Sequence, residues 1–236
     1  MVRPFSSRVK QACLVAACLT LFGLSPDRAT AADRYFALVF SSQATPKLPR
    51  FTHVWATMVK VSNVELPPEQ WVYQIDTISW FPATLVVRTF KLRTEPGVNL
   101  SLHETIKVVQ SHHEHVSVWG PFEAPVFMYR EFMCQKARLE SGAVRYQAID
   151  SLRNAQTVSD CIHSLTDMDR SNDRSAYPLS RFGDEAAEQF VKVIKQRGRL
   201  IAEGPSVEFA YQVLGLQCYA IRRRTTEPAV QFAVGR

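Results

Sequence analysis

The stretch FTHVWATMVKV, residues 51–61, alternates along its length in the way that a β-strand does. Every second side chain of a strand points to the same face. His53 and Trp55 therefore share one face, and Val54 and Ala56 share the other. This pattern predicts a strand over residues 51–61 that carries a histidine close to its start.

Similar segments lie on both sides of this strand. Short runs rich in strand-forming residues predict further strands at 34–40, 71–81, 85–92 and 115–121, with extended chain at 146–149 and again at 207–222. Sequential strands joined by short turns usually pair antiparallel. We therefore expect a mainly antiparallel sheet.

Helices are predicted between and after these strands. Ser101 and Glu104 form a capping box, in which the serine hydroxyl accepts from the amide of the glutamate and the glutamate reaches back to the cap amide. A helix should begin there and run to about Gln110. Two more helices are expected because apolar residues recur at helical spacing. One runs from Pro125 to Gly142, and the other is capped by Asp184 and ends at Gly198. The order of elements predicts an α+β fold with helices packed on the sheet.

The chain has 236 residues, of which 46% are hydrophobic and 21% are charged. This composition excludes a disordered chain and a small disulfide scaffold. No linker rich in proline, serine or glycine divides the sequence. We expect one domain over residues 32–236.

Residues 1–31 have the pattern of a signal peptide. Basic residues precede the apolar run 12–24, and Ala29-Thr30-Ala31 is the small-x-small pattern that a signal peptidase cleaves. The run is about a dozen residues, short of the ~20 that cross a bilayer. The alternatives are an uncleaved anchor and a lipid on Cys18. The mature protein should begin near Ala32, be secreted or periplasmic, and have no integral membrane span.

Removal of residues 1–31 leaves 24 basic and 21 acidic residues. Half of the net positive charge therefore belongs to the targeting segment. The remaining cluster, Arg222-Arg223-Arg224, is short and has no interleaved aromatic residues, so it predicts a solvated strand end. We expect no nucleic-acid partner.

Several motifs of common enzyme sites are absent from the sequence: a glycine-rich phosphate loop, His-Glu-x-x-His, Cys-x-x-Cys and Gly-x-Ser-x-Gly. A histidine cluster at His112, His113 and His115, with His103 as a fourth member, suggests a metal-binding protein as one alternative. Adjacent side chains rarely converge on one ion, so a solvated polar turn explains the cluster as well. We predict no metal ligand and no cofactor.

Aromatic residues suggest a further alternative. Trp55, Trp80 and Trp119 would line the ligand-holding face of a secreted binding protein without catalytic activity. Core packing explains the same residues equally well.

Cys161 is the strongest candidate for a nucleophile. In the stretch SDCIHSL, residues 159–165, Ser159 or Asp160 can cap a helix whose first turn holds the sulfur. A helix dipole and free amides favour the thiolate there and can stabilise an oxyanion. Three cysteines remain after cleavage of the signal peptide, and we expect any disulfide to join Cys134 and Cys218.

The order of these features resembles the circularly permuted branch of the NlpC/P60 papain-like proteins, which includes the lecithin retinol acyltransferase-like enzymes. His53 opens a strand similar to the histidine strand of that branch. The segment from Pro125 through Tyr146 is similar to the helix and G-x-x-Y segment that precede the nucleophile, and Ser159-Asp160-Cys161 takes the place of an Asn-Cys pair.

The resemblance implies a papain-like fold and a cysteine-dependent hydrolase or acyltransferase that acts on an amide or an ester. It implies Cys161 as nucleophile and His53 as base, about 3–4.5 Å apart. A third polar residue should come from the neighbouring strand, where Asp76 is the acidic choice and Thr77 and Ser79 are the alternatives. The expected partner is a small-molecule, peptide or cell-envelope substrate.

Overall fold

The structure is a computed structural model that describes residues 33–150, 156–168, 181–197, 200, 202–203 and 207–225. The chain divides into two units, Met1–Ala32 and Asp33–Arg236. All the described residues belong to the second unit, so the predicted signal peptide lies outside them.

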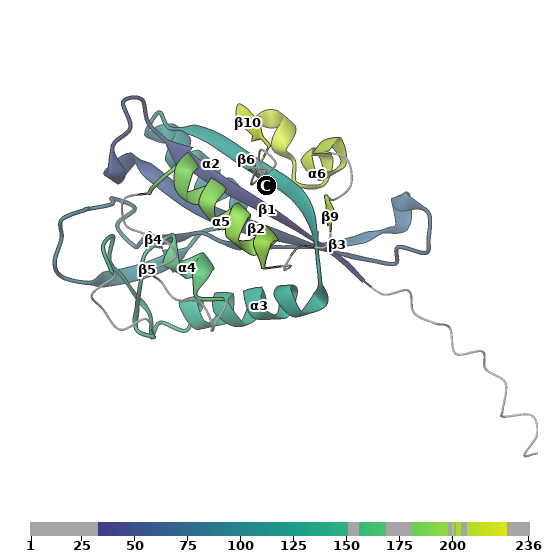
Figure 1. Ribbon diagram of the computed structural model, residues 1–236, viewed down its shortest axis with the longest axis horizontal. Coiled ribbons are helices and arrows are strands. Elements are labelled where there is room, and N and C mark those ends of the chain that lie inside the picture. The colour runs from purple at the N-terminus through teal and green to yellow at the C-terminus, as the bar shows by residue number, and fades with distance from the viewer. Residues whose placement is uncertain are drawn as a thin grey trace, which may run out of the picture. The chain divides into compact units, whose positions relative to one another are not determined.

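The larger of the two sheets has six strands (Figure 1). Five of them follow the order β10-β6-β1-β2-β3, and β9 pairs with β6 outside this order. Its strands are β1 (Arg34–Gln43), β2 (Thr52–Ser62), β3 (Val72–Ile78), β6 (His115–Ala124), β9 (Ala202–Glu203) and β10 (Ile221–Arg224). Within this sheet β10 runs parallel to β6, whereas the other pairs are antiparallel.

The smaller sheet has the order β4-β5-β7-β8. Its strands are β4 (Trp80–Pro82), β5 (Glu95–Asn99), β7 (Arg145–Tyr146) and β8 (Val158–Ser159). The helices are α2 (Leu102–Ser111), α3 (Val126–Glu140), α4 (His163–Thr166), α5 (Asp184–Gln196) and α6 (Val207–Val213), with short 3-10 turns at Pro49–Phe51, Pro68–Gln70 and Leu216–Cys218. The predicted α+β class is confirmed.

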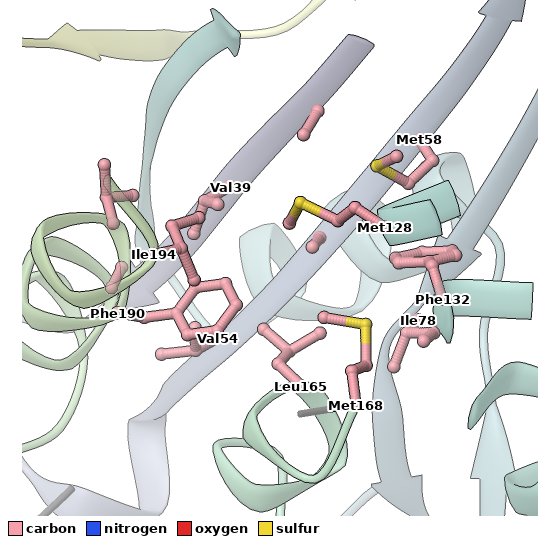
Figure 2. Packing of buried hydrophobic residues seen from close by; sticks show 14 of the residues in the cluster. Val39, Val54, Met58, Ile78, Met128, Phe132, Leu165, Met168, Phe190 and Ile194 are labelled. Atoms are coloured by element: carbon pink, nitrogen blue, oxygen red, sulfur yellow. The ribbon is translucent and has the colours of Figure 1, made fainter. Parts of the chain in front are cut away.

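Two hydrophobic clusters occupy the two faces of the larger sheet, because alternate side chains of its strands point to opposite faces. The first cluster includes Val39, Val54, Met58, Ile78, Met128, Phe132, Leu165, Met168, Phe190 and Ile194 (Figure 2). The second includes Phe36, Leu38, Phe40, Trp55, Val59, Phe81, Ile106, Val116, Val118 and Leu214. Helices α3, α4 and α5 therefore cover one face, and α2 and α6 cover the other.

The strand predicted at 85–92 is wrong. Residues 83–94 form a loop between β4 and β5, although they keep the alternation of a strand. Leu85 and Val87 pack against the second cluster, while Val86 and Phe90 point to solvent. The segment has the side-chain pattern of a strand without a partner strand.

The extended chain predicted at 207–222 is also largely wrong, because its first half is α6. Ala210 and Leu214 are one helical turn apart and both enter the second cluster. Gly215 then adopts a left-handed conformation, φ 63°, which ends the helical segment. Only β10 at the end of the range is extended.

The starts predicted at Ser101, Pro125 and Asp184 are all close to the observed ones, and α3 begins at Val126, directly after Pro125. The capping box of Ser101 and Glu104 is present, and α2 follows it. Asp184 is the first residue of α5 rather than its cap, which is Gly183. Its carboxylate instead bonds Ser41 and Arg224, and so ties α5 to the sheet.

Candidate active site

Cys161 lies in the turn before α4, which is a single helical turn. The predicted cap is wrong in position, because the N-cap of α4 is Ile162, and Cys161 precedes the helix. The Asp160 carboxylate still holds the turn, since it accepts a hydrogen bond from the backbone amide of His163 at 2.6 Å. The helix itself is too short to supply much of a dipole, because peptide dipoles must align over several turns to add up. The reactivity of the thiol therefore depends on its immediate neighbours.

Buried ionisable groups hold the turn that carries Cys161 in place. The fully buried carboxylate of Asp150 accepts from the Asp160 amide at 2.9 Å and lies 2.5 Å from Nδ1 of His163. Nδ1 of His163 is also 3.5 Å from the Asp160 carboxylate. Since buried charges need such partners, this network fixes the backbone on both sides of Cys161.

The sulfur of Cys161 lies at an open edge of β2. Strand β3 pairs with β2 only as far as Ala56, opposite Ile78, so residues 52–55 have no partner in β3. Burial of the sulfur, followed by the charge of Asp160, raises the pKa of the Cys161 thiol well above its ordinary value. Hydrogen bonding from the backbone of Val54 opposes this rise in pKa. The sulfur therefore sits beside the residue that follows His53.

His53 is buried on the face of the second cluster. Its ring centroid is 3.8 Å from that of Phe81 and 5.5 Å from that of Trp55. Burial lowers the pKa of His53 from 6.5 to about 3. The imidazole is therefore neutral near neutral pH, and in this buried position it is a weak base.

Ser79 holds the ring of His53, with 2.9 Å between the serine Oγ and the imidazole Nε2. Ser79 lies at the break between β3 and β4, and the side chain of Asn99 accepts from its backbone amide at 2.7 Å. The Thr105 hydroxyl of α2 is 2.7 Å from Ser79 Oγ and 2.8 Å from the carbonyl of Ser101. A line of hydroxyl groups thus leads from α2 to the imidazole.

The structure selects Ser79 among the three candidates for the residue that orients His53. Asp76 is paired with Met58, well along β2, and its carboxylate binds Lys136 at 2.8 Å and Gln74 at 2.9 Å. Thr77 bonds Thr57 at 3.0 Å. The prediction that Asp76 orients His53 is therefore wrong, because the Asp76 carboxylate is bound to the amine of Lys136 in α3.

The structure does not show the predicted contact between Cys161 and His53: the imidazole packs on Phe81 of the second cluster, whereas α4, which follows Cys161, covers the face of the first. The sulfur lies next to the backbone of the histidine strand, through Val54. No hydrogen bond joins the sulfur to the His53 ring among the residues that the structure describes. The separation of about 3–4.5 Å stays a prediction.

A pocket of about 120 Å³ opens beside His53. Its lining consists of Arg50, Phe51, Thr52, His53, Phe81, Leu85, Val86, Val87, His112 and Glu114. Glu114 is buried and lies 2.5 Å from the hydroxyl of Ser42. Burial raises the pKa of Glu114 from 4.5 to about 7, against the opposing effect of Ser42. The pocket combines apolar walls with two groups that can exchange protons.

Three of the four histidines of the predicted cluster have separate partners. His103 bonds the hydroxyl of Tyr219, His112 lies 3.6 Å from Glu114, and His115 lies 3.6 Å from Asp184. Across the described ranges, the one group with metal-ligand spacing is Asp150, Asp160 and His163, whose candidate ligand atoms lie within 4.8 Å of one another. Those side chains already build the turn at Cys161, so the histidine-cluster alternative has no support.

The tryptophans of the binding-protein alternative are core residues. Trp55 is buried in the second cluster, and Trp80 and Trp119 are buried in the first, so they form no exposed face. The disulfide expected between Cys134 and Cys218 is absent, and both thiols are free and exposed. Cys134 lies on α3 and Cys218 beside Leu216 of the second cluster, on opposite faces of the sheet.

Sequence reasoning missed Asp150, His163 and Thr105 as parts of the site. Asp150 and His163 are thirteen positions apart and no motif joins them. Thr105 could have been noticed as a polar residue on the apolar side of α2, where its neighbours Leu102, Ile106 and Val109 are buried.

Family models, curated proteins and solved structures were each compared with the chain, and none matches it. Within the described residues, no helix has the length and apolarity needed to cross a membrane. The argument for function therefore rests on the geometry of the site.

Proposed function

We propose that the protein is a cysteine-dependent hydrolase or acyltransferase that acts on an amide or ester, with Cys161 as nucleophile and His53 as base. The observation that carries the proposal is the position of the Cys161 sulfur at the backbone of Val54, the residue that follows His53 in β2, while Ser79 binds Nε2 of the buried His53 imidazole. A nucleophile, a base and a group that orients the base are the parts that thiol acyl transfer needs.

The hydroxyl groups behind His53 bear on which ring nitrogen acts. Thr105 is in the first turn of α2, and its hydroxyl is a donor to Ser79 and to the carbonyl of Ser101. The donor in the hydrogen bond between Ser79 and Nε2 of His53 depends on the imidazole tautomer. The tautomer protonated at Nε2 is the one that leaves the Nδ1 lone pair of His53 available as the base.

The resting pair is a neutral thiol and a neutral imidazole. Burial and Asp160 raise the pKa of the Cys161 thiol, and burial lowers the pKa of His53. A thiolate–imidazolium pair is therefore disfavoured before substrate binds. Proton transfer is expected to accompany attack on the carbonyl rather than to precede it.

In the first half of the reaction, the sulfur of Cys161 bonds to the carbonyl carbon while His53 takes the thiol proton. The carbon–nitrogen or carbon–oxygen bond to the leaving group then breaks, and the imidazolium returns that proton to the departing amine or alcohol. A water or another acceptor attacks the thioester in the second half. His53 takes the proton of the acceptor, and the thiol is regenerated.

The pocket beside His53 is the proposed substrate site. Its apolar wall includes Phe51, Phe81 and Leu85, which would take an apolar part of the substrate. Glu114, with its pKa raised to about 7, would pair with a polar group of the substrate. The proposal keeps a small-molecule, peptide or cell-envelope substrate and needs no cofactor.

The proposal extends to fold and location. A mainly antiparallel, papain-like arrangement, of the kind found in the permuted NlpC/P60 branch, accommodates a histidine strand followed by a nucleophile before a helix. Export of a mature protein that begins near Ala32 would follow from the signal-peptide pattern of residues 1–31.

The test is acyl transfer from p-nitrophenyl acetate, followed by peptide mass mapping of the acetylated residue. Wild-type protein should release p-nitrophenol and carry a transient acetyl group on Cys161. Cys161→Ala should lose this label, and His53→Gln should slow acetylation of Cys161 by ~10²-fold or more, as expected for loss of a general base.

Cys134 and Cys218 are internal controls, because both are exposed thiols and neither lines the pocket beside His53. Their slower labelling should be the same in wild type and in His53→Gln. Acetylation at Cys134 or Cys218 without any at Cys161 would contradict the proposal. An equal rate of Cys161 acetylation in wild type and in His53→Gln would contradict it as well.

A further inference from the structure

We propose that the loop of residues 83–94 binds the surface of an anionic lipid bilayer. Its outward side chains include the two most exposed large apolar residues of the described chain, Phe90 at 88% and Leu92 at 78%, together with Val86 at 53%. Exposed apolar side chains of this size that gather on one short segment commonly mark an interaction surface. The inference does not depend on the proposed catalytic activity.

The loop has two different sides. Leu85 and Val87 pack against the second cluster and anchor the segment to the domain, while the alternate residues face away from it. Figure 1 shows this connection between β4 and β5 as a wide loop beside the smaller sheet. The outward side therefore presents apolar side chains from a loop that turns at residues 89–90 and has no partner strand.

The charge of the loop selects the partner. Residues 83–94 include Arg88, Lys91 and Arg93 but no acidic residue. The neighbouring carboxylate, Glu95, is buried and lies 3.2 Å from Lys91 and 3.9 Å from Arg88. Phenylalanine and leucine between cations are the residues that insert at a bilayer interface, where anionic headgroups attract lysine and arginine.

The loop also forms part of the rim of the pocket at His53. Leu85, Val86 and Val87 line that pocket, and Phe90 follows them by three residues. Binding of the outward side to a bilayer would therefore hold the pocket close to the lipid surface. This position suits a molecule that reaches the pocket from a membrane or from the cell envelope.

The test uses the full chain and vesicles of phosphatidylcholine, alone or mixed with an equal part of phosphatidylglycerol. Sedimentation should show binding to the mixed vesicles that salt weakens. Phe90→Ser with Leu92→Ser should reduce this binding roughly tenfold or more, and Arg93→Gln should reduce it about fivefold. Phe127→Ser and Arg130→Gln, on exposed positions of α3, are matched controls that should bind as wild type does.

A second measurement locates the contact, because the apolar run 12–24 could also bind vesicles. Phe90→Trp should become quenched by brominated lipid beyond the quenching of wild type, and Phe127→Trp should not. Equal vesicle binding by the loop variants and wild type, or absence of quenching at position 90, would overturn the proposal. Self-association of the chain that the Phe90→Ser change abolishes, without vesicle binding, would instead assign the surface to a protein contact.

Discussion

The histidine side and the cysteine side of the candidate site are held in place by different chemistry. His53 belongs to a long strand, and neutral hydroxyl groups of Ser79 and Thr105 position its ring. Cys161 belongs to an irregular turn that the buried charged groups Asp150 and His163 support. The regular strand keeps its backbone conformation without buried ion pairs, whereas the turn depends on buried interactions whose loss strongly destabilises the fold.

The largest expected effect tests the cysteine side. Asp150→Ala should lower the free energy of unfolding by about 3–5 kcal/mol, because it leaves the buried His163 and the Asp160 amide without this carboxylate. Urea denaturation at neutral pH measures it. Glu188→Ala, which breaks an exposed pair with Lys192, is the control and should cost less than about 1 kcal/mol. Similar losses in both variants would mean that the buried network does not hold the turn.

A pH effect tests the pocket next to the histidine side. The pKa of Glu114 is raised to about 7 in the folded protein, from 4.5. The neutral carboxyl therefore contributes stability that is complete below pH 4.5 and is lost as the pH rises through 7, by about 3 kcal/mol. Urea midpoints measured from pH 5 to pH 8 should fall in wild type relative to Glu114→Gln, which cannot ionise. Parallel midpoints across this range would show that Glu114 is already solvated.

Removal of the serine behind His53 should have a smaller effect on stability and a clear effect on the site. Ser79→Ala takes a partner from His53 and from Thr105, at a cost of about 1–3 kcal/mol. The Nδ1 and Nε2 signals of His53 in nitrogen NMR should also show a changed tautomer balance. Thr77→Ala, on β3 near the end of the strand, is the control. It should leave the nitrogen signals of His53 unchanged.

The smallest effect concerns the helix that carries Thr105. Ser101→Ala removes the cap of α2 and should cost about 1 kcal/mol of stability. Thermal unfolding measures the change, and Ser101→Asp should restore most of it because aspartate also caps helices. A loss of several kcal/mol would mean that α2 supports the His53 side more strongly than its single cap suggests.

Local signals made part of this structure predictable. The start of α2 depends on Ser101 and Glu104, which interact within one turn, so the sequence alone was sufficient. The strand at 51–61 was found because its period of two is unbroken. Both predictions use contacts between residues that are near one another in the chain.

Other parts depend on partners that are distant in sequence. The loop 83–94 alternates as a strand does, and only the sheet order shows that it has no partner. The sequence favours Asp76 over Thr77 and Ser79, and only the register of β2 and β3 shows that Ser79 lies beyond the last pair. The pairing of Asp150 with His163 crosses residues that carry no local signal.

The early end of β3 has a consequence for solubility as well as for chemistry. Strand residues 52–55 would present unpaired backbone groups to other chains, and such edges promote intermolecular sheet formation. The segment that carries Cys161 occupies this edge at Val54. Proteolysis within that segment would therefore convert the domain into a species prone to aggregation, even before the loss of any catalytic function could be measured.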